Sequence, residues 1–125
     1  LAFSTAGLLD MALADPRMVQ QGAPAPDRDA IAAELTAIAA RGYANNRDTL
    51  RIGVSSVAIP VFDASARAFA TCSIAYPTSR GGAAREAELA ALLMARGRDL
   101  TEAMGGAVPP DVHSIWTPEA ERAAS

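Results

Sequence analysis

The sequence contains no lysine, one cysteine, one histidine and six aromatic residues. The lone Cys72 excludes an internal disulfide framework and an all-cysteine metal site, and a single histidine leaves no metal-ligand set visible. No apolar run approaches the ~20 residues of a membrane span, and no basic-then-apolar signal segment is present. We therefore expect no metal, no cofactor and no membrane association and, from the unpaired cysteine, a cytoplasmic location.

Positive charge is also scarce. All 11 basic residues are arginines, they are scattered among 14 acids, and the net charge is −3. Because nucleic-acid binding normally needs a clustered basic surface, this chain by itself is not expected to hold DNA. Its 125 residues, half of them hydrophobic and 30 of them alanine, suffice for one domain with a core of small aliphatic side chains. The chain begins with Leu1 rather than methionine, which predicts a fragment of a longer protein.

Hydrophobic periodicity and turn residues predict a mixed fold. One helix is capped by Asp27 or Asp29 and ends at Gly42, where a left-handed glycine commonly terminates a helix. The two longer strands are joined by residues 63–66, which form a short hairpin connection, so these strands are predicted to be antiparallel neighbours. The expected elements are helices at 4–14, from Asp27 or Asp29 to Gly42 and at 83–104, and strands at 43–46, 52–62 and 68–76.

This order of elements indicates an α+β fold, in which helices cover an antiparallel sheet. Pro60 cannot donate to a ladder, so its end of the strand is predicted to be an edge or a bulge. Two or three strands make a poor sheet, which predicts further strands before Leu1 or from another copy. The domain is expected to span 1–106, and 107–125 to form an extended or frayed tail anchored by Trp116. The predicted inner stripe of the last helix comprises Leu89, Leu92, Leu93, Leu100 and Met104.

Small hydroxyl side chains occur inside the two apolar strands. Since side chains alternate along a strand, Ser56, Ala58 and Pro60 share one face of the first strand and Val57, Ile59 and Val61 the other. On the second strand Thr71, Ser73 and Ala75 share one face. A buried polar group costs roughly 1–3 kcal/mol unless it is hydrogen-bonded, so these hydroxyls need a partner. They could form the floor of a shallow ligand cavity, or they could bond to local backbone in an ordinary core.

An enzyme using Cys72 or Ser73 as nucleophile is a further alternative, and it would require His113 within hydrogen-bond reach. Cys72 has no basic neighbour in the sequence and more readily packs as a small hydrophobe. No catalytic residue is therefore assigned. Gly81-Gly82 precedes a helix, but it lacks the G-x-G-x-x-G frame of a phosphate-binding loop.

Four short motifs follow one another between Arg41 and Arg80, and the signal lies in their order and spacing taken together. Together they resemble the C-terminal effector-binding domain of IclR-type transcriptional regulators. The resemblance implies a GAF-like antiparallel sheet covered by helices, of which the N-terminal part is absent from this chain. The motifs are R-G-Y at 41–43, G-V at 53–54, A-I-P-V-F-D at 58–63 and P-T-S-R at 77–80.

The resemblance also implies a function. Such a domain binds a small organic or aromatic acid that modulates DNA binding, is not an enzyme, and assembles as a homodimer or homotetramer. DNA would be bound only through a winged helix-turn-helix domain that this chain does not contain. The alternative is an oligomerisation or interaction module that has the same fold and has lost its ligand.

Six positions are implied as ligand-binding. Asn46 stands where the family commonly has an acid, and Ala75 where serine is frequent, so the ligand's identity cannot be carried over. A carboxylate could bind at the N-terminal end of the first helix, near Gly7, with hydroxyl and amide donors from the strands. The implied ligand-binding residues are Gly7, Leu8, Asn46, Ser56, Ser73 and Ala75.

Overall fold

The computed structural model describes residues 1–4, 7–16, 27–48 and 51–118. Within these residues three strands form one antiparallel sheet in the order β1-β2-β3, which confirms the predicted hairpin and the α+β class. The predicted 63–66 connection joins β2 to β3. In chain order the elements are α1 (Leu8–Ala14), α2 (Arg28–Arg41), β1 (Ala44–Arg47), β2 (Val54–Phe62), β3 (Ala68–Pro77), α3 (Gly82–Ala103) and α4 (Pro110–Trp116).

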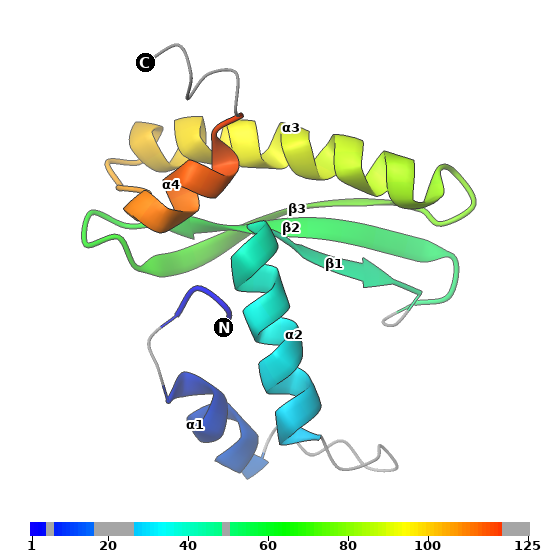
Figure 1. The fold of residues 1–125 in the computed structure, drawn as a ribbon, viewed down its shortest axis with the longest axis horizontal. Coiled ribbons are helices and arrows are strands. Elements are labelled where there is room, and N and C mark those ends of the chain that lie inside the picture. Colours follow the sequence, from blue (N-terminus) through cyan, green and yellow to red (C-terminus); the bar gives the residue numbers. More distant parts are fainter. Residues whose placement is uncertain (5–6, 17–26, 49–50, 119–125) are drawn as a thin grey trace.

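Helices lie on both sides of the sheet (Figure 1). The long α3 and the short α4 cover one face, and α2 approaches the other face with its C-terminal end. Helix α1 lies farther from the sheet, beside the N-terminal half of α2. An ion pair joins these two helices, with Arg28 Nε 2.6 Å from Asp10 Oδ1. Both side chains are more than half exposed, so this pair adds little stability.

Helix α2 begins and ends at the residues that the sequence predicts. The Asp27 carboxylate accepts hydrogen bonds from the backbone N–H groups of Asp29 (3.0 Å) and Ala30 (3.2 Å). These bonds satisfy two of the donors that a helix start leaves unpaired. At the other end Gly42 adopts φ 89°, a left-handed conformation that favours glycine, and its N–H bonds to the carbonyl of Ile38 at 2.9 Å.

The hydrophobic core lies between the sheet and α3. Val57, Ile59 and Phe62 of β2 are at most 1% exposed, and they form one cluster with Leu89 and Leu93 of α3. At Gly97 the helix passes so close to Ile59 that any side chain there would collide with it. The backbone of α3 at Gly97 therefore lies directly against the end of the Ile59 side chain.

The predicted extended tail is wrong for residues 110–116, which form α4. Pro110 stands at the start of the helix, where its fixed φ and missing N–H are compatible with helical geometry. Trp116 does anchor the segment as predicted: it is 2% exposed, and its indole N–H donates to the Gly42 carbonyl at 2.8 Å. The end of the predicted tail, 119–125, lies outside the described residues.

The predicted inner stripe of α3 is only partly correct. Leu89 and Leu93 are buried, but Leu92, Leu100 and Met104 are 48%, 38% and 57% exposed. The inward face follows a 3.6-residue period that includes polar and small residues, and Leu92 and Leu100 are each one position away from it. The buried residues of α3 are Glu86, Leu89, Ala90, Leu93, Gly97 and Thr101.

The sheet has one short edge strand and one long edge strand. β1 pairs with β2 only from Ser55 to Ala58, so Pro60 lies beyond the end of β1, and the β2–β3 register shifts between Val61 and Phe62. The prediction for Pro60 is confirmed. β3 forms the other edge over ten residues. Among the described residues, no helix has the length and apolar character to cross a membrane.

Candidate functional site

The register of the strands brings four of the six implied ligand-binding residues together. Asn46 of β1 lies opposite Ser56 of β2, and Ser56 lies opposite Ala75 of β3. In the adjacent row, Ala58 of β2 lies opposite Ser73. Directly opposed residues of an antiparallel pair share a face, with Cβ atoms ~4.5–5.5 Å apart. These two rows define a single surface, the open face, which is turned away from α3.

The polar side chains of the open face are accessible. Ser73 and Ala75 are exposed, and Asn46 and Ser56 are half-buried. Within the described residues, the hydroxyls of Ser56 and Ser73 bond to no other group. The alternative in which local backbone satisfies these hydroxyls inside an ordinary core is therefore not what the structure has. The hydroxyls remain available to water or to a ligand.

Gly7 and Leu8 lie apart from the open face. Both are exposed at the start of α1, the helix that Figure 1 places beside α2 and away from the sheet. Gly7 lines a hollow of about 320 Å³ together with Thr36 and Ala39 of α2, and no residue of the sheet is among its described lining. The sequence predicts a helix start that helps to enclose the polar floor, and the structure does not have that arrangement.

A larger hollow adjoins the open face at its hairpin end, and we call it the apolar hollow. Its volume is about 500 Å³, and it is bounded by the N-terminal segment 1–4, by Leu35 and Ile38 of α2 and by the sheet. Ala58, which lines it, belongs to the same row as Ser73. None of the described residues that line it has a charged side chain. Polar and apolar surfaces thus meet on one face of the sheet.

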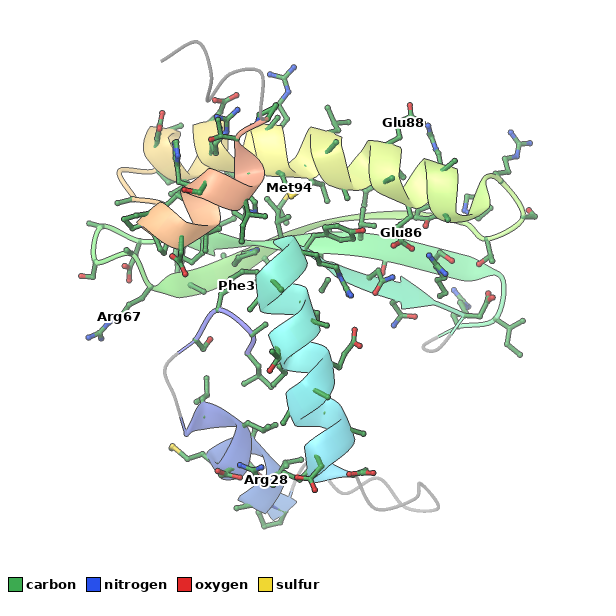
Figure 2. All side chains as sticks on the ribbon, viewed as in Figure 1. Phe3, Arg28, Arg67, Glu86, Glu88 and Met94 are labelled. Carbon is green, nitrogen blue, oxygen red and sulfur yellow. The ribbon has the colours of Figure 1, made fainter. Side chains whose placement is uncertain are left out.

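A buried carboxylate of α3 lies against the side of β1 that is turned away from the open face, and sequence reasoning missed it. Figure 2 shows Glu86 directed from α3 toward the sheet, and its side chain is 7% exposed. Its Oε2 accepts from Arg47 Nε at 2.7 Å, and its Oε1 accepts from Asn45 Nδ2 at 3.0 Å and from the Tyr43 hydroxyl at 3.4 Å. These four residues are the Glu86 network, which ties the first turns of α3 to β1.

The Glu86 network keeps its acid ionised. Burial raises the pKa of Glu86, but hydrogen bonds from Asn45, Arg47 and Tyr43 together with the charge of Arg47 outweigh it and hold the pKa below its ordinary value. Burial, followed by the charge of Glu86, raises the pKa of the Tyr43 hydroxyl. The pair at the centre of the network is therefore a carboxylate and a guanidinium at neutral pH.

The predicted strand 43–46 stops one residue short of Arg47, whose role sequence reasoning also missed. Arg47 belongs to β1, and its guanidinium reaches Glu86 on α3. No local pattern marks Glu86 itself, because it follows Arg85 on an otherwise solvent-compatible helical turn. Its burial depends on a contact with β1, 39 residues earlier in the chain.

Cys72 and His113 belong to different environments. Cys72 packs against the hydrophobic core on the α3 side of β3. His113 is exposed on α4, where its Nδ1 lies 3.4 Å from the Thr117 hydroxyl. Ser73 lies on the opposite face of β3 from Cys72, since neighbouring strand residues alternate. These positions give no support to a nucleophile activated by His113.

Comparison with known proteins gives the family. Residues 2–102 match the family model described as bacterial transcriptional regulator IclR C-terminal. A search of curated proteins found no match. Among solved structures, an IclR transcriptional regulator from Silicibacter sp. TM1040 is 31% identical with a TM-score of 0.75, over 88% of this chain and 44% of that one.

Two further structures share the fold at lower identity. The IclR protein of Thermotoga maritima is 23% identical with a TM-score of 0.71, over 83% of this chain and 42% of that one. The C-terminal domain of the E. coli transcriptional regulator KdgR is 24% identical with a TM-score of 0.70, over 84% of this chain and 65% of that one. This chain therefore spans less than half of the longer relatives. On its match over residues 2–102, the chain belongs to the IclR C-terminal family of bacterial transcriptional regulators.

Proposed function

We propose that this chain is the effector-sensing part of a cytoplasmic IclR-type DNA-binding regulator, and that a small organic or aromatic acid binds to its open face. The proposal includes a homodimeric or homotetrameric assembly, contact with DNA through a domain outside this chain, and no enzymatic role. Family membership supports the regulatory context. The observation that carries the binding site is the pair of rows that unites Asn46, Ser56 and Ser73 on one accessible sheet face.

The open face can supply what a small carboxylate needs. The hydroxyls of Ser56 and Ser73 and the amide of Asn46 are neutral donors, and each can bond to a carboxylate oxygen. A small acid that stays partly hydrated on the side away from the sheet does not need an additional positively charged side chain in order to bind. An acid bound in this way bridges β1, β2 and β3, because the three donors belong to three different strands.

A ligand bound at Asn46 can influence α3 on the other side of the sheet. Asn45 and Arg47 flank Asn46 on β1, and both donate to Glu86 of α3. An effector that favours one position of β1 would thereby favour one position of α3. Regulation requires only that the effector binds two such arrangements with different affinity.

A thermal-shift and calorimetric titration of this chain with small organic acids tests the proposal. We expect an acid that raises the melting temperature of the wild type to bind about fivefold or more weakly to Ser73→Ala and to Asn46→Leu, since each loses one hydrogen bond to a charged group. Ser65→Ala, which removes an exposed hairpin hydroxyl, is the matched control and should bind normally. If no acid stabilises the chain, or if these variants respond as the wild type does, the binding site is wrong.

The exposed apolar residues of α3 favour a second function, that of an interaction module without a ligand. Leu92, Leu100 and Met104 are large apolar side chains that lie exposed on this one helix. If this role is the correct one, the chain should self-associate in sedimentation-velocity experiments, and Leu92→Glu should return it to a monomer. Failure of every acid to bind, combined with this loss of association, would favour the module over the sensor.

A further inference from the structure

The apolar hollow and the polar rows of the open face are continuous with each other. Ala58 lines the hollow, and its cross-strand neighbour Ser73 belongs to the polar part of the face. Opposed side chains of this kind have Cβ atoms ~4.5–5.5 Å apart, and the next row, which contains Ser56, lies about 6.6 Å along the strand. A molecule of the size of one ring with a substituent can therefore contact both surfaces at once.

The lining of the hollow determines which part of a ligand it can take. Apolar side chains line it from α2 (Leu35, Ile38), from the N-terminal segment (Phe3) and from β2 (Ala58). No charged side chain is found in the part of the lining that the structure describes. An anionic group placed there would lose much of its hydration, and the described side chains that line the hollow offer it no charged partner and only the hydroxyls of Ser4 and Thr71. An apolar group placed there would gain from the removal of its surface from water. The volume of about 500 Å³ lies within the usual range of ligand pockets.

Small side chains keep this space open. Ala44 and Ala58 lie opposite each other on β1 and β2, and both line the hollow. Residues with larger side chains at these two positions would occupy the space above the sheet. Thr71 lines the hollow from β3 and is exposed, so its side chain points into space that is not already filled.

We infer that the apolar hollow is a specificity subsite, which selects acids that carry an apolar body about as large as a six-membered ring and rejects acids as small as acetate or pyruvate. This inference rests on the proposed function, since it assigns the carboxylate of the ligand to Ser73 and Ser56. The ring of the ligand covers Ala44 and Ala58. A two- or three-carbon acid reaches the hydroxyls but leaves the hollow to water.

Titration of the 125-residue chain with benzoate, cyclohexanecarboxylate, acetate and pyruvate tests the inference. We expect the two ring acids to bind at least about tenfold more tightly than acetate or pyruvate, because several additional carbon atoms leave water. Thr71→Leu and Ala58→Leu, which fill the hollow, should weaken binding of the ring acids about tenfold or more without weakening the small acids. Ala91→Leu makes the same change at an exposed position of α3 and should leave all four affinities unchanged.

The possible outcomes distinguish a failure of the specificity subsite from a failure of the proposed acid-binding function. If acetate and pyruvate bind as tightly as the ring acids, and the filling variants have no effect, the subsite is refuted while acid binding stands. If none of the four acids binds, the proposed function fails and the subsite falls with it. Should Ala58→Leu prevent folding, Thr71→Leu still decides the matter, because residue 71 is exposed and a larger side chain there disturbs no packed core.

Discussion

Replacement of Glu86 by glutamine should destabilise the domain although it changes only one functional group. The carboxylate accepts hydrogen bonds from Arg47, Asn45 and Tyr43 and is 7% exposed. In Glu86→Gln one oxygen becomes an NH₂ group, which cannot accept from the guanidinium. Arg47 is itself half exposed and recovers hydration, so the cost stays below that of breaking a fully buried pair. We expect a loss of about 2 kcal/mol, or roughly 6–10 °C in Tm.

The dependence of this loss on pH tests its cause. The pKa of Glu86 is lower in the folded chain than its ordinary value of 4.5, so its contribution is complete above about pH 4.5 and disappears as the pH falls through the lower, folded-state pKa. Glutamine does not titrate. The difference in Tm between the wild type and Glu86→Gln should therefore stay constant from about pH 7 to about pH 5 and shrink at lower pH.

A neighbouring residue supplies the control. Glu88 lies two positions away on α3, is 68% exposed and pairs with Arg85 at 3.0 Å. Figure 2 shows the two glutamates on opposite sides of the helix. Glu88→Gln should change the free energy of unfolding by less than about 0.5 kcal/mol. A Glu86→Gln protein as stable as the wild type at neutral pH, or a difference that persists unchanged in acid, would refute the assigned role of the network.

Two further substitutions test the packing around α3. Gly97→Val should lower the free energy of unfolding by about 2–3 kcal/mol, because any side chain there meets Ile59 and Trp116. Ala91→Val, on the exposed side of the helix, should lower it much less. Urea unfolding followed by circular dichroism measures both variants, and equal stabilities would contradict the close approach at Gly97. Trp116→Phe should cost about 1–3 kcal/mol, because it leaves the Gly42 carbonyl without its indole donor. Unchanged midpoints for that variant would show that the bond contributes nothing.

Local chemistry made most of the elements predictable from sequence. Asp27 and Gly42 terminate α2 through bonds to residues at most four positions away, and a short polar connection sets the β2–β3 hairpin. The period of two in β2 also predicts the burial of Val57, Ile59 and Val61, but it misses the buried Pro60 and Phe62 near the register shift. For α4 the paired prolines indicated an extended segment, although Pro110 is also compatible with the first turn of a helix.

Features that depend on distant contacts were not predictable in this way. Helix α3 approaches the Ile59 side chain closely at Gly97, and the same inward face includes Glu86 and excludes Leu92. A prediction of the inward face from hydrophobic residues alone includes Leu92 and leaves out Glu86. For the site, alternation along β2 and β3 predicts that Ser56 and Ser73 are turned to the same side. No local sequence pattern predicts the position of α1, which places Gly7 away from the sheet.

The long outer edge formed by β3 has a practical consequence for work in solution. Its ten residues, Ala68–Pro77, include no charged side chain, and proline occurs only at the last position. Charge and proline are the usual means by which exposed edges avoid pairing with a neighbouring chain. Samples of this chain should therefore become turbid at high concentration sooner than their negative net charge suggests. A single Thr71→Lys replacement at the middle of the edge should extend their useful concentration range.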